Sequence, residues 1–351
     1  MMYTKQPKKL MIINILDILR RYSDENHRLS QKDIMEILHN EYEMTVDRKA
    51  IKRNLMNLID FGYPLEYSES VRLNKRGEEE IIYTDWYLER AFSDAELRLL
   101  IDSLLFSKHI PYSQCKELIE KIEGLSNRYF KSKVRHVCNL PVDQPQNKDL
   151  FYTIEILDEA IEKNRQVVFQ YGDYGTDKKI HLREGEDKKP REYLVNPYQM
   201  VAANGRYYLI ANIEKYNNVS HYRIDRICNI KITDTPAKPQ RKVVGLENGL
   251  NIPKHMAEHI YMFSGESQKV TMRTTPGMAG ELIDWFGSGV RFYDETEDSV
   301  MAQVTANLKA MRFWALQYAP YVTILAPQSL VDMVKGDLEV ALTRYRAGDL
   351  E

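Results

Sequence analysis

A series of short, strand-forming stretches follows closely in the middle of the chain and limits the folds available to it. The stretches are Gln166–Tyr171, Ile180–Arg183, Arg191–Val195, Gln199–Ala202, Arg206–Asn212, Ser220–Ile224 and Cys228–Thr233. Asn204-Gly205 separates two of them and favours a tight hairpin turn, because both residues tolerate positive φ. Short strands at this density predict a small β-barrel.

Two of these stretches combine arginine with aromatic residues: Arg206-Tyr207-Tyr208-Leu209, and His221 through Ile227 with its two arginines. Arginine that is buried beside aromatic rings usually meets a carboxylate or a phosphate. Aromatic rings next to cations suit a nucleotide or a nucleic-acid single strand. We therefore predict ligand contacts from Tyr198, Tyr208, His221, Arg223 and Arg226.

Strand alternation limits how many of these side chains can face one ligand. Tyr207 and Tyr208 point to opposite faces of a regular strand, and we expect Tyr208 to be the exposed one. Arg223 and Arg226 also point to opposite faces unless the chain bends near Asp225. The alternative role for Arg226 is a structural salt bridge to Asp225 or to another acid.

The first part of the chain has the pattern of a helix-turn-helix. Apolar spacing predicts a helix over residues 8–22, Ser30 is a good N-cap for a helix over 31–39, and Thr45 precedes a helix that ends at Gly62. Strand candidates at 65–67 and 81–83 follow and resemble a β-wing.

The third predicted helix has two different faces. Ile51, Leu55 and Leu58 form an apolar face, while the opposite face is basic, as a recognition helix in the major groove requires. Residues 1–85 hold 14 Lys+Arg and 15 Asp+Glu, so binding would depend on a local patch. The alternative is a solvated charged face. Predicted DNA contacts are Thr45, Arg48, Lys49, Lys52 and Arg53, with Arg72, Lys75 and Arg76 in the wing.

The remaining chain reads as helices over 93–130, a polar linker over 139–149, a helix over 151–163 and a second linker over 236–251. From residue 268 the predicted order is βαββαβ with an added helix, which is the ferredoxin-like arrangement. The fold class is therefore multi-domain α+β. The predicted domains are residues 1–88, 89–150, 151–236 and 237–351.

Composition excludes several classes of protein. The formal net charge of -2 gives no overall sign of nucleic-acid binding. No apolar run approaches the roughly 20 residues that span a bilayer, and the N-terminus lacks a secretory pattern, so we expect a cytoplasmic protein. Cys115, Cys138 and Cys228 form no Cys-x-x-Cys pair, which argues against a zinc ribbon or a disulfide framework.

Enzyme patterns are weak. His255 and His259 have the i, i+4 spacing of zinc ligands, but a metalloprotease motif needs glutamate directly after the first histidine, where this chain has Met256. We expect an exposed helix turn there and no metal site. No phosphate-cradling loop or catalytic constellation occurs, so we expect neither enzymatic activity nor a cofactor.

At the level of motifs the chain resembles the WYL-domain transcriptional regulators of bacteria. Tyr207-Tyr208-Leu209 matches their name-giving Trp-Tyr-Leu, with tyrosine in place of tryptophan. Tyr222 through Ile227 matches their second motif, Phe-Arg-Leu-Asp-Arg-Ile. The resemblance extends over a winged helix, a helical connector, the WYL domain and a C-terminal extension.

The resemblance implies an Sm-like or SH3-like barrel that senses a nucleotide or single-stranded nucleic acid. It also implies homodimers, in which the connector and the C-terminal parts exchange contacts. We thus expect a ligand-responsive homodimeric regulator that binds a double-stranded DNA operator. The alternative is a nucleic-acid-binding accessory protein that modulates a nuclease or a phage-defence system.

Overall fold

The computed structural model describes residues 7–73, 77–107, 110–133, 147 and 149–347, and of residues 131–133 and 347 only the backbone. It is a mixed α+β protein with helices and several sheets, as predicted. Its contacts divide the chain into two compact units, residues 1–107 with 112–142 and residues 108–111 with 143–351. Within the described ranges, no helix is both long enough and apolar enough to cross a membrane.

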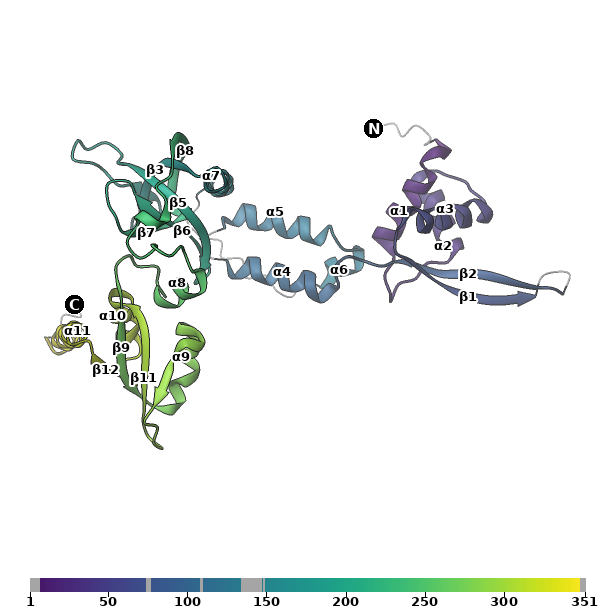
Figure 1. The fold of residues 1–351 in the computed structure, drawn as a ribbon. Coiled ribbons are helices and arrows are strands. Elements are labelled where there is room, and N and C mark those ends of the chain that lie inside the picture. Colours follow the sequence, from purple (N-terminus) through teal and green to yellow (C-terminus); the bar gives the residue numbers. More distant parts are fainter. Residues whose placement is uncertain (1–6, 74–76, 108–109, 134–146, 148, 348–351) are drawn as a thin grey trace. The chain divides into compact units, whose positions relative to one another are not determined.

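The first unit begins with a short turn of 3-10 helix, three α-helices and an antiparallel hairpin (Figure 1). These elements are η1 (Lys8–Leu10), α1 (Met11–Tyr22), α2 (Gln31–Tyr42), α3 (Arg48–Phe61), β1 (Leu65–Leu73) and β2 (Glu79–Leu88). Ser30 caps α2 and Gly62 ends α3 with a φ of 105°, both as predicted, and Asp33 completes a capping box with Ser30.

The start of α3 differs from the prediction. Asp47, and not Thr45, is its N-cap, because the Asp47 side chain accepts a hydrogen bond of 2.8 Å from the Ala50 amide. Thr45 is exposed and lies before the helix. The apolar face of α3 is buried as predicted, through Ile51, Leu55 and Leu58.

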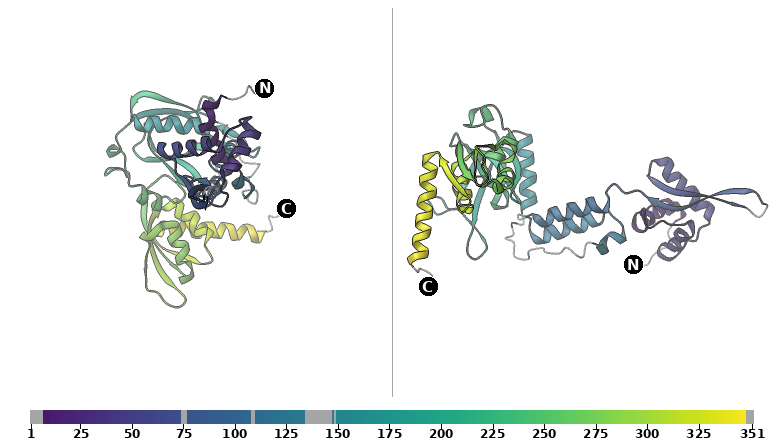
Figure 2. Two further views of the ribbon diagram at one scale, coloured as in Figure 1. Left: turned by 90° about the vertical axis from the view of Figure 1, so that its right-hand side faces the viewer. Right: turned by 90° about the horizontal axis from the view of Figure 1, so that it is seen from below.

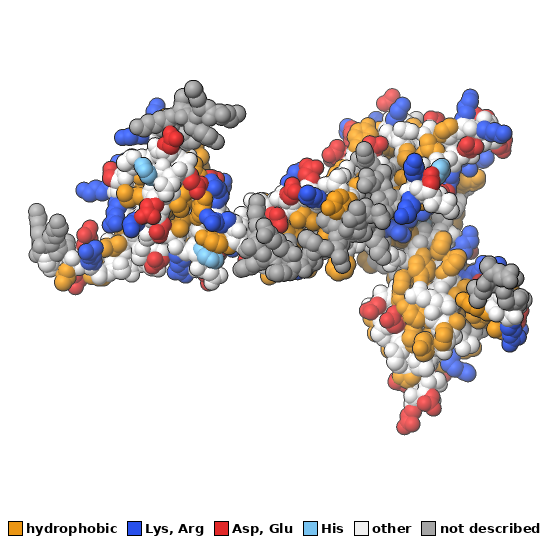
Figure 3. Space-filling model, turned by 180° about the vertical axis from the view of Figure 1, so that it is seen from behind, with side chains coloured by type: hydrophobic (Ala, Val, Ile, Leu, Met, Phe, Trp, Pro, Cys, Tyr) orange, Lys and Arg blue, Asp and Glu red, His pale blue; other side chains and the backbone are white. Residues whose placement is uncertain are grey.

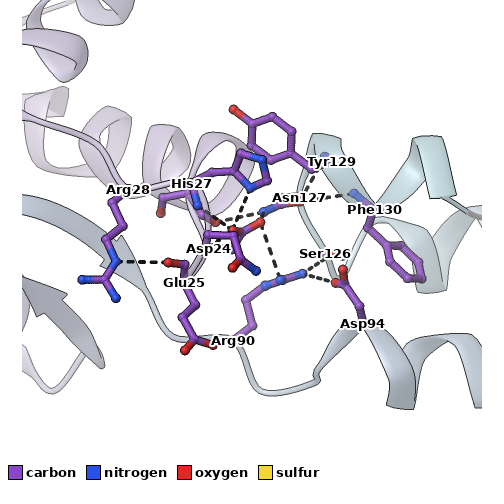
Figure 4. A network of polar contacts seen from close by, with 12 residues as sticks. Asp24, Glu25, His27, Arg28, Arg90, Asp94, Ser126, Asn127, Tyr129 and Phe130 are labelled. Carbon is purple, nitrogen blue, oxygen red and sulfur yellow. Dashed lines mark hydrogen bonds and ion pairs between the residues drawn. The ribbon is translucent and has the colours of Figure 1, made fainter.

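The second half of this unit contains α4 (Asp94–Phe106), α5 (Tyr112–Glu123) and α6 (Arg128–Lys133). A polar network joins the end of α1 to the start of α6 (Figure 4). Asn127 donates hydrogen bonds to the Ser23 carbonyl at 3.0 Å and to Asp24 at 2.6 Å. Arg90 donates to Asp94 at 2.8 Å and to Ser126. The three-helix part and the helices after it are thus tied by buried polar groups.

The second unit opens with α7 (Leu150–Glu162) and a six-stranded sheet. Its strands are β3 (Arg165–Tyr174), β4 (Ile180–Leu182), β5 (Glu192–Ala203), β6 (Arg206–Ile213), β7 (Val219–Arg223) and β8 (Ile227–Pro236). They are joined in the order β4-β3-β5-β6-β7, and β8 pairs with β3. Asn204 and Gly205 have φ values of 52° and 72°, so the predicted hairpin turn between β5 and β6 is confirmed.

One strand prediction was wrong in this sheet. The stretches 191–195 and 199–202 form the single strand β5, because a register shift between Pro197 and Gln199 accommodates the proline. The linker predicted over 236–251 is also more ordered than expected. It contains η4 (Gln240–Lys242), and Val243 and Leu246 are buried. Of the linker predicted over 139–149, residues 139–146 and 148 lie outside the described residues.

The C-terminal part has the helices and strands predicted for it, preceded by α8 (Ile252–Glu258), where the sequence predicted only a helix turn at His255 and His259. The elements are β9 (Ser267–Thr274), η5 (Pro276–Met278), α9 (Ala279–Phe286), η6 (Gly287–Gly289), β10 (Arg291–Tyr293), β11 (Val300–Asn307), α10 (Leu308–Gln317), β12 (Val322–Ala326) and α11 (Gln328–Ala347). The sheet order is β10-β11-β9-β12. Figure 2 shows α11 (yellow) extending away from the sheet that precedes it.

Candidate functional site

Two arginines of the second sequence motif converge on one tyrosine ring. The 3-10 turn η3 (Ile224–Arg226) bends the chain directly after β7. Arg223 donates two hydrogen bonds to Asp225, at 3.0 and 2.6 Å, and Arg226 donates one to Asp173 at 2.9 Å. Both guanidinium groups lie over the ring of Tyr174, at 5.9 and 5.5 Å from its centre. We call these residues the arginine–tyrosine site.

Arg223 and Arg226 could face the same way only if the chain bends near Asp225, and the 3-10 turn supplies this bend. It also places an acid beside each of them, so the salt-bridge alternative for Arg226 describes a contact that forms, with Asp173 as the acid. Asp173, Tyr174 and Arg183 were not predicted, because their place depends on the pairing of β3 with β4 and on the position of η3.

Positive side chains outnumber negative ones in this site, which favours an anion. Arg183 also pairs with Asp173, at 2.6 Å, so three arginines face two aspartates. The Arg183 guanidinium holds the pKa of the Asp173 carboxyl below its usual value. The Arg226 Nε atom is buried without a hydrogen-bond partner. Such an orphaned donor is rare in folded proteins and marks a place where a water or ligand acceptor fits.

Tyr174 lies at the centre of this site. Its hydroxyl is buried and makes no hydrogen bond of normal geometry. Burial, with the nearby Asp225 carboxylate, raises the pKa of Tyr174 to about 12, so this hydroxyl stays protonated at neutral pH. It is therefore available as a donor to an acceptor placed beside the two arginines.

The other predicted ligand residues take three different positions. Tyr208 pairs with Arg223 across β6 and β7 and packs against Val201, Ile210 and Met262. Tyr207 is the more exposed of the two tyrosines, at 37%, so the expectation for Tyr208 was wrong. Strand alternation places the two tyrosines on opposite faces but does not say which face is covered. The segment that contains Met262 packs on the face that carries Tyr208.

Tyr198 does not join the arginines. It is buried against Val243 and Leu246, and its hydroxyl donates a hydrogen bond of 2.9 Å to the Lys238 carbonyl. Its role in the structure is therefore to hold the segment after β8 against β5. The prediction placed it with the arginines because these residues are close in the sequence or adjacent through hairpin pairing.

His221 meets two other histidines. Its Nε2 atom lies 2.7 Å from Nε2 of His255, and the rings of His255 and His259 stack at 4.2 Å. A helix turn is present at His255 and His259, as expected, but the expectation that it is exposed was wrong, because both side chains are buried. Burial and the neighbouring rings lower the pKa of His221 to about 2 and that of His255 to about 4, so these two are uncharged near neutral pH.

The predicted DNA contacts of the first unit remain on its surface. Arg48, Lys49 and Arg53 are exposed on α3, and Lys52 is half-buried with its ammonium 4.1 Å from the centre of the Tyr83 ring. None of these four, which we call the basic face of α3, forms an ion pair with a carboxylate of the described residues. In the hairpin, Arg72 is exposed opposite Glu80. Lys75 and Arg76 lie outside the described residues.

Two family matches cover the second unit. Residues 152–232 match the WYL domain, and residues 266–342 match the WCX domain. The first match contains the arginine–tyrosine site and both sequence motifs. No curated protein matches the chain at a significant level.

Two solved structures align with nearly the whole chain. One is proteasome accessory factor B/C (PafBC) of Arthrobacter aurescens, at 17% identity and a TM-score of 0.28, covering 97% of this chain and 49% of PafBC. The other is described as a CRISPR Cas-related protein, at 13% identity and a TM-score of 0.37, covering 99% of this chain and 89% of that one. The chain thus spans about half the length of PafBC. The chain therefore contains a WYL domain followed by a WCX domain, which confirms the resemblance drawn from the sequence.

Proposed function

We propose that this protein is a ligand-responsive, homodimeric, DNA-binding transcriptional regulator whose WYL domain senses a nucleotide or single-stranded nucleic acid. In this proposal residues 1–88 are a winged helix-turn-helix, 89–150 a connector that takes part in dimerisation, 151–236 an Sm-like or SH3-like barrel and 237–351 a ferredoxin-like extension. The partners are an operator duplex, the sensed ligand and a second copy of the chain. We assign the protein no catalytic role and no cofactor.

The basic face of α3 is the observation that carries the DNA-binding part. The helix buries Ile51, Leu55 and Leu58, so its opposite side is held toward solvent. Cations that lack carboxylate partners are free to exchange their counterions for DNA phosphates. A helix with this division of faces, followed by a hairpin, is suited to the major groove with the hairpin on the adjacent backbone.

The arginine–tyrosine site supports the sensing part. Arginine binds phosphate through paired N–H donors, and here the guanidinium groups are held in place by aspartates before any ligand arrives. The unpartnered Arg226 Nε and the Tyr174 hydroxyl supply two further donors in the same place. A phosphate beside these donors is the anion that the site fits best.

Exposed apolar side chains on the C-terminal part support a homodimer (Figure 3). The second half of α11, residues 338–346, is exposed throughout, although Leu338, Leu342 and Tyr345 repeat at i, i+4 and i+7. An apolar stripe of this kind on a projecting helix usually packs against a partner. Dimeric readers need half-sites near one helical turn apart, so a ligand that rotates the two reading domains would change DNA affinity.

The test of the DNA-binding proposal is a gel shift with the DNA upstream of the protein's own gene, at fixed salt. A variant with Arg48, Lys49, Lys52 and Arg53 changed to alanine should lose binding. The matched control changes Lys269, Arg273, Arg291 and Lys335, which are exposed on the C-terminal part, and should still bind.

Undiminished binding by the α3 variant would remove the basis for the assignment. Affinity for single strands, with no preferred duplex, would favour the alternative of an accessory protein for a nuclease or a phage-defence system. In that case the face of α3 would serve contact with another protein.

A further inference from the structure

A cavity lies in the first unit between the three-helix part and the helices after the hairpin, and the proposed function does not use it. Its volume is about 670 Å³. Pockets that hold small molecules usually have roughly 300–1,000 Å³. It is lined by the end of α1, the link from α3 to β1, the end of β2 with the link to α4, and the link from α5 to α6, which are residues 19–20, 63–64, 88–91 and 124–126. We call this cavity the junction pocket.

Polar contacts hold the walls of the junction pocket in place. The Glu89 amide donates a hydrogen bond of 2.9 Å to the Pro64 carbonyl, which joins the segment before β1 to the segment after β2. The Arg90 guanidinium forms ion pairs with Asp94 at 2.8 Å and with Asp24 at 3.8 Å (Figure 4). The position of Arg90 is therefore fixed, and its charge is balanced by carboxylates of its own chain.

Apolar side chains make up much of the lining. Leu19 and Leu88 are buried in the hydrophobic core of the three-helix part, whereas Leu125 is 57% exposed. Tyr63 is half-buried and adds an aromatic ring. Covering an exposed leucine and an aromatic ring in a concave place is favourable, because it removes apolar surface from water. The lining therefore favours a ligand with a hydrocarbon or aromatic body.

The pocket also carries one positive and one negative side chain without an opposite charge. Arg20 and Glu89 are exposed, and neither forms an ion pair with a residue that the structure describes. The Arg20 guanidinium lies 5.9 Å from the centre of the Tyr63 ring, so the cation stands beside the aromatic part of the lining. A ligand that satisfies both side chains needs an anionic group and a cationic group of its own.

We propose that the junction pocket binds a small zwitterion with an apolar body, of the kind formed by an apolar amino acid or an apolar dipeptide. Arg20 binds the carboxylate and Glu89 binds the ammonium group, while the leucines and Tyr63 contact the apolar side chain. A simple carboxylic acid or a simple amine fits less well, because each leaves one of the two charged side chains without a partner. The pocket shares no residue with the arginine–tyrosine site, so this inference does not depend on the ligand proposed for the WYL domain.

The test is isothermal titration calorimetry of the full chain with L-phenylalanine and with L-leucyl-L-leucine, which distinguishes a free amino acid from a dipeptide. We expect one equivalent of at least one of these probes to bind and to raise the Tm, because a ligand of the folded state stabilises it. Hydrocinnamate lacks the ammonium group of phenylalanine, and phenethylamine lacks its carboxylate. Each should bind at least tenfold more weakly than the zwitterion. Failure of both zwitterions to bind the folded, unchanged protein would overturn the proposal.

Variants of the two charged side chains locate the binding site. Arg20→Gln and Glu89→Gln should each weaken binding of the zwitterion at least tenfold, and because both side chains are exposed, the variants should stay folded. Far-UV circular dichroism verifies this. Arg28→Gln is the matched control, because Arg28 is also exposed and lies 4.9 Å from the centre of the Tyr87 ring, but does not line the pocket. It should bind the zwitterion as the unchanged protein does.

The variants also give the result that would contradict the proposal. Unchanged affinity in folded Arg20→Gln and Glu89→Gln variants would mean that the zwitterion binds elsewhere on the chain, and would overturn the assignment to the junction pocket. An equal loss of affinity in Arg28→Gln would overturn it as well, since a general effect of removing positive charge would then explain the result.

Discussion

The basic face of α3 and the arginine–tyrosine site both gather positive charge, but they hold it differently. On α3 the cations are at the surface and lack carboxylate partners among the described residues. In the WYL domain, Arg223 and Asp225 form a pair in which the side chains are 15% and 5% exposed. Exposed, unpaired cations suit a long polyanion whose binding weakens with salt, whereas paired and oriented arginines suit one small anion in a fixed place.

The sharpest way to test this difference is to remove one buried partner. Arg223→Ala leaves the Asp225 carboxylate buried without its ion pair, and the free energy of unfolding should fall by about 3 kcal/mol. Urea denaturation of the purified chain measures the change. Arg183→Ala is the control, because its pair with Asp173 is 46% and 48% exposed, and it should cost no more than about 1 kcal/mol. An equal loss in the free energy of unfolding for the two variants would contradict the claim that burial makes the Arg223–Asp225 pair the more important one.

The opposite behaviour is expected of the basic face of α3. Alanine at Arg48, Lys49, Lys52 and Arg53 removes no buried partner, so the free energy of unfolding should change by less than about 1 kcal/mol per residue. Duplex affinity should fall at least tenfold in the same variant. Unfolding in urea and fluorescence anisotropy measure the two quantities. A large loss of stability would show that these side chains support the fold.

The buried carboxylate of Asp24, in the first unit, tests whether burial makes a charged group important for stability outside the WYL domain as well. Burial opposes the ionisation of Asp24, but hydrogen bonds from Asn127 and His27 outweigh it and hold the pKa of this carboxyl below its usual value of 3.8. The stabilisation is therefore present above pH 3.8 and is lost as the pH falls through the lowered pKa. Asp24→Asn should cost about 2 kcal/mol at pH 7 and less at pH 3, measured by urea denaturation. A cost that does not depend on pH would mean that the charge is unimportant.

The smallest effect concerns the start of the helix that carries the basic face. Asp47→Ala should lower the free energy of unfolding by about 1 kcal/mol, because it removes the acceptor for the Ala50 amide. Thr45→Ala should change it by less than about 0.5 kcal/mol, since Thr45 lies outside the helix. Thermal unfolding compares the two variants. A larger effect at Thr45 would contradict the observed cap.

Features set by neighbours in sequence were predictable. The turn at Asn204-Gly205, the cap at Ser30 and the apolar face of α3 each depend on residues within a few positions. Thr45 and Asp47 are both suitable caps by residue type, so only the hydrogen bond to Ala50 distinguishes them. Pro197 divided β5 in the prediction because a proline usually interrupts a strand, unless a register shift absorbs it.

Contacts between distant segments were not predictable in the same way. Arg226 meets Asp173 only because η3 returns the chain to β3, and no local pattern gives that pairing. His221 meets His255 of α8, a helix of seven residues that the sequence indicated only as an exposed turn. Their meeting depends on how the segment after β8 folds back over the sheet, which is a tertiary property.

The central claim, that the basic face of α3 holds DNA phosphates, is tested most directly by the salt dependence of duplex binding. Fluorescence anisotropy gives the binding constant at several salt concentrations for the unchanged protein and for the fourfold α3 variant. The slope of log K against log[salt] should become shallower by about one for each phosphate contact removed, and so by up to about four. Identical slopes in the two proteins would contradict the claim.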